Sequence, residues 1–231
     1  IHMTNVLITG ANRGIGLEFA RQYADDGANV IACCRNPDSA TDLHALAEAH
    51  GNVAIHPLDV TSDESVAALK SDLGDMPIDH LINNAGVMGG KKQGLGDIDF
   101  GEWRACFEAN TLGPFRLIAA FADNVAASAE KKIMTVSSYM GSIGRKGKGA
   151  YIYRSSKAAV NMVTTLAATE LADKGIMAIP VHPGWVRTDM GGSGADISPA
   201  ESASGLRKVI AELTPERSGR FWNYNGEELP W

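Results

Sequence analysis

The chain alternates short, continuously apolar segments with longer amphipathic ones, and this alternation constrains its fold more than any other feature. The apolar segments have the length of β-strands and lie at 6–8, 28–34, 53–55, 80–82, 132–136 and 177–181. The amphipathic stretches have helical periodicity and lie at 17–25, 39–50, 63–73, 100–127, 153–173 and 198–213. Strands that are apolar along their whole length are typical of parallel sheets with helices on both faces. We therefore predict a doubly wound α/β fold.

The length of 231 residues favours one large domain, because an average domain has roughly 150 residues. Residues 3–231 contain no internal repeat, low-complexity tract or linker, so we expect them to form this single domain. The cysteines are three in number, and two of them, Cys33 and Cys34, are adjacent, so they predict no disulfide framework. A reducing, cytoplasmic location fits this composition.

Charge and hydropathy argue against two classes of partner. The chain has 21 basic and 27 acidic residues and a formal net charge of −6, which offers no basic field for a nucleic-acid backbone or an anionic lipid surface. No apolar run approaches the roughly 18 residues that span a bilayer. We therefore expect neither nucleic acid nor membrane as a partner. The six histidines show no metal-ligand spacing, so we expect no metal site.

A glycine-rich turn follows the first predicted strand and precedes the first predicted helix. It reads Thr9-Gly10-Ala11-Asn12-Arg13-Gly14-Ile15-Gly16. Glycines at this junction allow a tight turn and the close approach of a pyrophosphate, whose charge meets the free N–H groups of the helix. A plain strand-to-helix turn would also be rich in glycine, but the position within the first βαβ unit favours a ligand site. We predict that this turn binds a dinucleotide.

The spacing of these glycines, Gly-x-x-x-Gly-x-Gly, resembles that of the classical short-chain dehydrogenase/reductase family. The other motifs of the family follow in order: Asn83-Asn84-Ala85-Gly86, Asn110, Ser138, Tyr153-x-x-x-Lys157 and Pro183-Gly184-Trp185-Val186-Arg187-Thr188. Within the family, the segments 34–37, 182–192 and 226–231 resemble the bacterial C-factor-like branch. The resemblance covers residues 3–231, and it implies a Rossmann fold with a seven-stranded sheet.

The spacing of Tyr153 and Lys157 indicates acid/base chemistry even without the family resemblance. Residues four apart share one helix face, so an ammonium can lie near a phenol. A nearby cation would lower the pKa of the phenol from about 10 toward a useful acid/base range. An arbitrary pair of this kind is more often a solvated helix face, and only the other motifs decide against that interpretation here.

The family resemblance gives four residues a role in hydride transfer to a carbonyl group. Tyr153 would donate a proton to the carbonyl oxygen, and Lys157 would also hold the nicotinamide ribose. Ser138 would hydrogen-bond the same oxygen as its charge develops. Asn110 would hold a water that connects Lys157 to solvent.

Neighbouring residues leave two of these assignments open. Ser137 adjoins Ser138, and Tyr139 and Tyr151 lie near Tyr153 in the sequence. The family alignment favours the second serine. Only Tyr153 has a lysine four residues later.

The resemblance also implies which residues contact the cofactor. Besides Tyr153 and Lys157, these are Gly10, Asn12, Arg13, Gly14, Ile15, Gly16, Arg35, Asp59, Val60, Asn83, Ala85, Gly86, Pro183, Gly184, Val186 and Thr188. An NAD site expects an acid about 20 residues beyond the glycine turn, whereas a 2′-phosphate requires arginine. The corresponding strand end has no acid and is followed by Arg35, and Arg13 can meet a phosphate from the other side. We predict NADP(H), the alternative being that both arginines are simply surface residues.

The sequence thus predicts an NADP(H)-dependent oxidoreductase that reduces a small carbonyl compound to an alcohol, or catalyses the reverse reaction. The alternative is a protein of another class, an NADP-binding regulatory or signalling protein of C-factor type with little turnover. The complete set of four residues favours the enzyme, because binding alone does not require Tyr153. Trp185 and the segment 191–197 are expected to wall the substrate. The helices with Asn110 and Tyr153 resemble the family's four-helix dimer contact, so we expect a homodimer or homotetramer.

Overall fold

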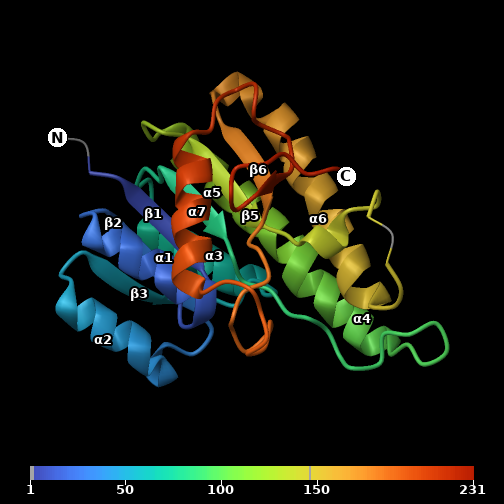
Figure 1. Ribbon diagram of the computed structural model, residues 1–231. Helices are drawn as coiled ribbons and strands as arrows, with labels where there is room; N and C mark the ends of the chain where they lie inside the picture. The colour runs from blue at the N-terminus through green and yellow to red at the C-terminus, as the bar shows by residue number, and fades with distance from the viewer. Residues whose placement is uncertain (1–2, 146) are drawn as a thin grey trace.

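The computed structural model describes residues 3–145 and 147–231, and it shows strands alternating with helices (Figure 1). The first part of the chain forms β1 (Asn5–Thr9), α1 (Gly14–Asp25), β2 (Asn29–Cys34), α2 (Thr41–Ala49), β3 (Val53–Pro57), α3 (Asp63–Leu73) and β4 (His80–Asn83). The second part forms α4 (Phe100–Phe107), α5 (Gly113–Ala126), β5 (Lys132–Val136), α6 (Tyr151–Glu170), β6 (Met177–His182), α7 (Pro199–Ala211) and β7 (Trp222–Asn223). All six strands expected from apolar runs are present.

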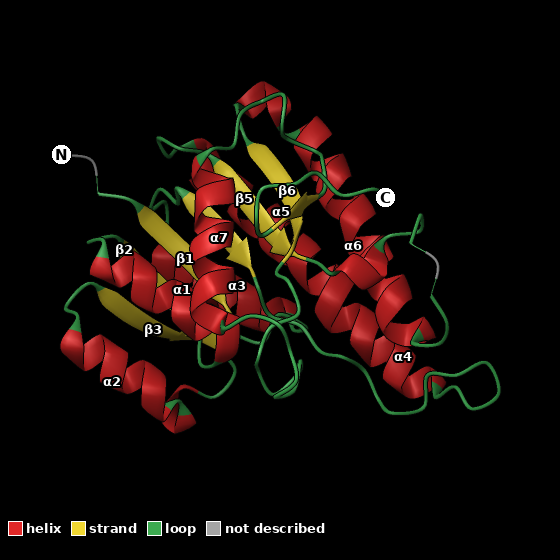
Figure 2. Cartoon of the chain, viewed as in Figure 1, coloured by secondary structure: helices red, strands yellow, loops and turns green. Residues whose placement is uncertain are grey.

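The strands of the described residues form one parallel sheet of seven, in the order β3-β2-β1-β4-β5-β6-β7. Helices α1, α2 and α7 cover one face, and α3, α5 and α6 cover the other (Figure 2). The predicted single-domain, doubly wound Rossmann fold is confirmed. The strand order reverses between β1 and β4, and a parallel sheet of this kind binds ligands at the carboxyl ends of the strands at such a reversal.

Strand β1 shows why the middle of a strand in this sheet is apolar. Val6 and Ile8 belong to the core under α1 and α7, whereas Leu7 belongs to the core under α3 and α5. All three side chains are fully buried, at 0% exposure. Because successive side chains point to opposite faces and both faces are covered, no position in the strand can be polar without a cost.

The long helix expected over residues 100–127 is interrupted, so that expectation is corrected. A π-helical turn at Glu108–Leu112 separates α4 from α5. The side chains of Asn110 and Thr111 inside this turn are buried and bonded to other elements: Asn110 to the backbone of Val87 and Thr111 to the carbonyl oxygen of Ser156. Hydropathy alone does not register such a turn, because it shifts the helical register by only one residue.

The seventh strand, β7, has only two residues and leaves no hydropathy signal. Trp222 pairs with Val181 of β6, and the N–H of Tyr224 donates to the carbonyl oxygen of His182 at 2.9 Å. The ring of Trp231 stacks on that of Phe221, with centroids 5.8 Å apart. These aromatic residues pack at the edge of the sheet.

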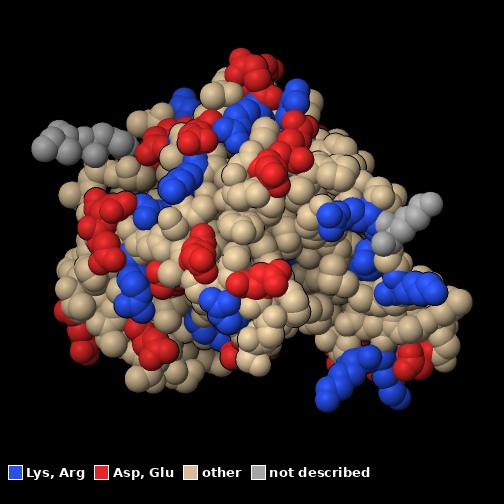
Figure 3. All heavy atoms as spheres, in the orientation of Figure 1, with Lys and Arg blue, Asp and Glu red and all other residues tan. Residues whose placement is uncertain are grey.

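The surface carries charges of both signs. Lys and Arg side chains are interspersed with Asp and Glu on the face shown in Figure 3. Among the described helices, none has the length and apolar composition that crossing a bilayer requires.

A buried polar network joins the amino ends of the strands, opposite the ligand edge. The hydroxyl of Tyr23 lies 2.9 Å from Nδ1 of His80, whose Nε2 lies 2.8 Å from the carboxylate of Glu130. Lys132 donates to the same carboxylate at 3.0 Å. The hydrogen bond with His80 is the main reason that the pKa of Glu130 falls from 4.5 to about 2.

Stability in acid should therefore depend on Glu130. Because its folded pKa is depressed, the carboxylate stabilises the fold above about pH 4.5, and this contribution is lost as the pH falls toward 2. We expect Glu130→Gln to lower the free energy of unfolding by about 1 to 2 kcal/mol at pH 7. The difference from the wild type should shrink between pH 4.5 and 2, as measured by urea unfolding. Glu48→Gln, on the exposed side of α2, is the control, and a gap that does not change with pH would contradict the assignment.

Candidate active site

The turn between β1 and α1 has a backbone conformation and a close contact that require glycine. Gly10 and Gly14 have φ angles of +65° and +56°, in the left-handed region that strains other residues. A Cβ on Gly16 would lie 2.1 Å from the carbonyl oxygen of Gly10, so the start of α1 packs directly against the turn. Within the described residues no side chain caps this end of α1. Its free N–H groups are therefore available to an anion.

Asn84, directly after β4, ties the turn to the neighbouring strand. Its side-chain amide donates to the carbonyl oxygens of Thr9 and Gly10 at 2.9 and 3.2 Å. The hydroxyl of Thr9 in turn accepts from the backbone N–H groups of Asn84 and Ala85 at 3.0 and 2.9 Å. Asn84 is absent from the predicted site residues. A second asparagine directly after a buried strand is the signal that could have found it.

A cavity of about 480 Å³ opens at the carboxyl ends of the strands, where the strand order reverses. Most of the predicted cofactor residues line it: Gly10, Asn12, Arg13, Gly14, Ile15, Arg35, Asp59, Val60, Ala85, Gly86, Tyr153, Lys157, Pro183 and Thr188. The structure therefore brings the glycine turn and the Tyr153–Lys157 pair, which are far apart in sequence, to one cavity.

Four predicted cofactor residues lie outside this lining. Gly16 packs against Gly10, and Val186 is buried where it bridges to Ile197. Gly184 has a φ angle of +86°, and a Cβ there would lie 2.5 Å from Ile197. Asn83 is buried, and its amide donates to the hydroxyl of Thr135 at 3.4 Å. These four residues pack against other parts of the protein and do not line the cavity.

The two arginines expected at a 2′-phosphate both line the cavity. Arg35 lines it just after β2. Arg13 also lines it, and its guanidinium forms an exposed ion pair with Asp189 at 3.0 Å. Asp59 lies on the same side, where hydrogen bonds from the N–H and hydroxyl of Thr61 lower the pKa of its carboxyl. The cavity lining here therefore combines Arg13 and Arg35 with the carboxylates of Asp59 and Asp189.

Tyr153 and Lys157 line the cavity from the first turns of α6. Both are buried, at 6% and 5% exposure, which excludes a solvated helix face. The ammonium of Lys157 donates to the carbonyl oxygen of Val136 at 2.9 Å and lies 5.7 Å from the centre of the Tyr153 ring. The end of β5 therefore fixes the position of the lysine.

The expectation that Lys157 lowers the pKa of Tyr153 is wrong in this structure. Burial raises the pKa of Tyr153 to about 12, and the hydrogen bond with Ser138 lowers it only in part. Burial likewise lowers the pKa of Lys157 to about 8. Desolvation disfavours the charged form of each group and is the largest cause of both shifts.

Asn110 reaches the same site from the π-helical turn. Its Oδ1 accepts from the N–H of Val87 at 2.8 Å, and its Nδ2 donates to the carbonyl oxygen of Val87 at 2.8 Å and to the hydroxyl of Ser156 at 3.0 Å. A Cβ on Gly86 would lie 3.1 Å from Oδ1 of Asn110 and 3.4 Å from Nζ of Lys157. Asn110 and Lys157 therefore flank the backbone of Gly86.

The two neighbouring serines have different hydrogen-bond partners. The hydroxyl of Ser137 donates to the carbonyl oxygen of Lys157 at 3.3 Å. Ser138 hydrogen-bonds Tyr153, and its Oγ accepts from the N–H of Met140 at 3.1 Å. Ser138 is therefore the serine beside the phenol, although Ser137 is the one that borders the cavity.

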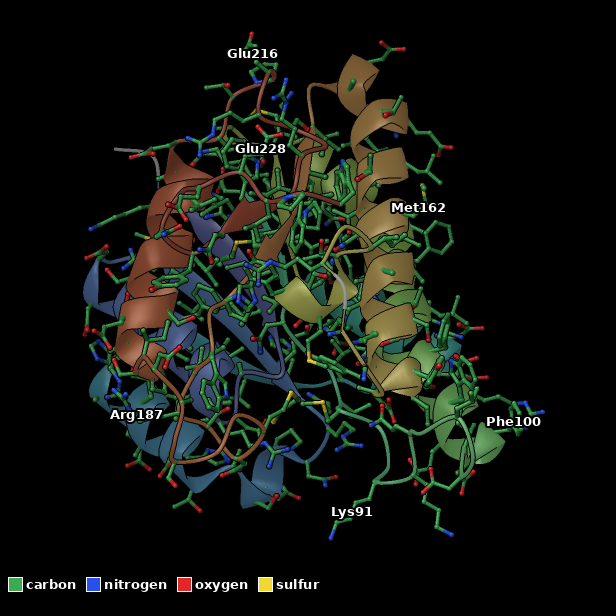
Figure 4. All side chains as sticks on the ribbon, turned by 45° about the vertical axis from the view of Figure 1, so that its right-hand side comes forward. Lys91, Phe100, Met162, Arg187, Glu216 and Glu228 are labelled. Carbon is green, nitrogen blue, oxygen red and sulfur yellow. The ribbon has the colours of Figure 1, made fainter. Side chains whose placement is uncertain are left out.

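The segment after β6 folds over one side of the cavity. The indole of Trp185 donates to the carbonyl oxygen of Gly191 at 2.9 Å, and its ring remains half exposed. Arg187, labelled in Figure 4, donates to the carbonyl oxygens of Ala195 and Asp196 at 3.2 and 2.9 Å. These bonds hold the segment as a structured loop next to the cavity.

Two relatives show strong similarity to the chain. C-signal of Myxococcus xanthus is 44% identical over 156 residues, which cover 67% of this chain and 93% of that protein. The 1-hydroxy-2-glutathionyl-2-methyl-3-butene dehydrogenase of Rhodococcus sp. (strain AD45) is 38% identical over 237 residues, which cover 99% of this chain and 100% of that protein. The similarity to C-signal agrees with the predicted C-factor-like branch.

Solved structures give the same picture for the fold. The NADPH-bound carbonyl reductase from chicken fatty liver superposes with a TM-score of 0.91 at 34% identity, and the match covers 100% of both chains. The family model of the short chain dehydrogenases matches residues 4–196. The predicted family is therefore confirmed: the chain belongs to the short chain dehydrogenases.

Proposed function

We propose that the protein is an NADP(H)-dependent oxidoreductase that reduces a carbonyl compound to an alcohol, or catalyses the reverse. One observation carries the proposal: the buried Tyr153–Lys157 pair and the glycine turn with Arg13 and Arg35 line the same cavity. The similarity to an NADPH-bound carbonyl reductase over the whole chain supports it. Membership of the family makes hydride transfer the expected chemistry.

Tyr153 and the residues around it are suited to donating a proton to the substrate. A phenol whose pKa is raised to about 12 is protonated at neutral pH, so Tyr153 can give its proton to a carbonyl oxygen. The hydroxyl of Ser138, hydrogen-bonded to the phenol, can stabilise the charge that develops on that oxygen. NADPH, when bound, supplies the hydride for the carbonyl carbon. Lys157, with a pKa of about 8, can return a proton to Tyr153 after turnover.

The glycine turn and the two arginines fit the phosphates of NADP(H). The close approach of α1 to the turn leaves room for a pyrophosphate at free N–H groups. Arg35 and Arg13 line the cavity, and their guanidinium groups are suited to binding a 2′-phosphate. Arg13 would exchange its exposed partner Asp189 for the phosphate, which costs little because exposed ion pairs contribute little.

A second candidate function is that of an NADP-binding regulatory or signalling protein with little turnover. The similarity to C-signal favours it. The two candidates differ in what they require of Tyr153, because only the enzyme needs its proton.

We further propose that the chain forms a homodimer or homotetramer through α5 and α6. The apolar side chains Leu112, Phe115, Met162 and Leu166 are 41% to 61% exposed on and beside these helices. Met162 projects outward from α6 (Figure 4). Burial of such side chains against a second copy would remove apolar surface from water. The buried free thiols of Cys33, Cys34 and Cys106 are compatible with a cytoplasmic location, which we also propose.

Replacing Tyr153 should abolish reduction without abolishing binding. We expect Tyr153→Phe to lower kcat for any carbonyl compound reduced by the wild type by at least about 100-fold, because the proton donor is lost. Oxidation of NADPH is followed at 340 nm with a panel of aldehydes and ketones, and binding is followed by nicotinamide fluorescence. Tyr151→Phe, on the same helix but exposed, is the matched control. NADPH binding without turnover of any compound by the wild type would favour the signalling protein instead.

Replacing Arg35 should change the choice of cofactor. We expect Arg35→Asp to reduce the ratio of kcat/KM for NADPH to that for NADH by about 10- to 100-fold, because a charge-assisted contact with the 2′-phosphate becomes a repulsion. The two values are measured with one carbonyl compound at fixed ionic strength. Arg104→Asp, on the exposed side of α4, controls for the change in net charge. An unchanged ratio would show that Arg35 is only a surface residue.

The mass in solution should be a multiple of 24.4 kDa. We expect sedimentation analysis to give a dimer or tetramer for the wild type. Met162→Glu should shift the population toward the monomer, because it places a charge in the apolar contact. Leu95→Glu, at a position 83% exposed and outside α5 and α6, should have no effect. A wild-type particle of 24.4 kDa at micromolar concentration would overturn this proposal.

A further inference from the structure

His182, the last residue of β6, connects to the segment that carries the active-site serine. Its Nδ1 accepts a hydrogen bond from the backbone N–H of Tyr139 at 3.1 Å. Its ring also meets the ring of Tyr139 edge to face, with centroids 5.1 Å apart and an interplanar angle of 79°. The imidazole therefore contacts the residue next to Ser138 through both its polar and its apolar surface.

The hydrogen bond to His182 takes the place of a backbone hydrogen bond that would otherwise form between the ends of β5 and β6. Strands β5 and β6 pair as far as Val136 and Val181, and the N–H of Ser137 donates to the carbonyl oxygen of Val181 at 2.7 Å. In a parallel ladder, donors on one strand are two residues apart, so the next donor is Tyr139 and its acceptor would be the carbonyl oxygen of Pro183. That oxygen instead accepts from the hydroxyl of Ser202 at 2.6 Å.

The imidazole of His182 supplies the acceptor that the diverging backbone no longer offers. Its own backbone is anchored on the far side, because its carbonyl oxygen accepts from the N–H of Tyr224 at 2.9 Å. A buried backbone N–H without an acceptor would destabilise this segment. The side chain thus continues the sheet by one hydrogen bond beyond the end of β5.

This extra bond holds the turn from which Ser138 acts. Residues Tyr139–Gly141 form one turn of 3-10 helix, and Ser138 is its N-cap, with Oγ accepting from the N–H of Met140. We propose that His182 is a positioning residue: by accepting the N–H of Tyr139 it fixes the turn that places the hydroxyl of Ser138 beside Tyr153. The proposal rests on the proposed oxidoreductase function of that site.

The protonation state of His182 agrees with this role. Burial, with a contribution from the guanidinium of Arg145, lowers the pKa of the imidazole to about 4. Arg145 lies over the ring of Tyr139, 3.0 Å from its centroid, so a cation covers the other side of the same turn. A neutral imidazole has one nitrogen without a proton, and Nδ1 is then free to accept at neutral pH.

Two substitutions separate the hydrogen bond from simple packing. His182→Leu keeps an apolar side chain of similar reach but removes the acceptor, whereas His182→Asn offers Oδ1 close to the place of Nδ1. We expect His182→Leu to lower kcat by about 10- to 100-fold, because small misplacements of a catalytic group have effects of this size. The KM for NADPH should change less than about twofold, since the hydrogen bond between His182 and Tyr139 involves no residue of the glycine turn. His182→Asn should recover most of the lost kcat.

Rescue of kcat by His182→Asn is the readout that packing alone would not move, because asparagine restores the acceptor but not the imidazole ring. Rates are normalised to NADPH-binding sites, so that partial unfolding does not count as lost catalysis. Equal kcat values for His182→Leu and the wild type, or equal defects in both variants, would overturn the proposal.

An exchange measurement keeps this result separate from the proposed function. The backbone N–H of Tyr139 should exchange with deuterium faster in His182→Leu than in the wild type and in His182→Asn, as measured by NMR. This readout does not require a substrate. A wild type that reduces no carbonyl compound contradicts the proposed function, and equal exchange of Tyr139 in all three proteins contradicts the role of His182.

Discussion

The close contact between the start of α1 and the carbonyl oxygen of Gly10 is the constraint on which the ligand edge of this protein depends. It requires glycine at position 16, and it would bury the carbonyl groups of the turn without partners if nothing else approached. Asn84 resolves this problem, because its amide donates to Thr9 and Gly10. The carbonyl oxygens of the turn are thus satisfied from within the protein, while the N–H groups of α1 remain for a ligand. Asn84 also links the end of β1 to the end of β4, the two strands between which the sheet reverses its order.

A second physical effect governs Tyr153 and Lys157: burial disfavours their charged forms. Tyr153 and Lys157 are both shifted toward their neutral forms, since neither is surrounded by enough water to stabilise an ion. The proton is therefore held on the phenol, which suits a donor. Fixed backbone groups replace the missing water: the carbonyl oxygen of Val136 receives the ammonium of Lys157, and Val87 satisfies both ends of the Asn110 amide. The site is rigid because its polar atoms are paired with strand ends and with a helix.

The sequence predicted secondary structure best where the local hydropathy pattern directly reflects which side chains are buried. Continuous apolar runs predict the central strands, and the helix over 63–73 is found with the same bounds. The pattern was uninformative where the structure depends on partners distant in sequence. A two-residue strand such as β7 has no periodicity, and the π-helical turn around Asn110 is stabilised by residues 87 and 156. The direction of the pKa shift of Tyr153 was also inaccessible, because spacing reveals a neighbouring cation but not the depth of burial. Asn84 and His182 were not predicted as site residues for a related reason: each satisfies backbone groups at the end of another strand.

The alternation of side chains along β2 gives the two adjacent thiols separate surroundings. Cys33 belongs to the core beneath α3 and α5, whereas Cys34 belongs to the core beneath α1 and α2 and also borders the cavity. Neighbours in sequence thus lie in different helical layers, divided by the sheet itself. An alkylating reagent applied in pulses during unfolding would therefore reach each thiol when its own layer opens. Peptide mapping of the two labels would time the detachment of the layers independently, in a chain that already carries both reporters.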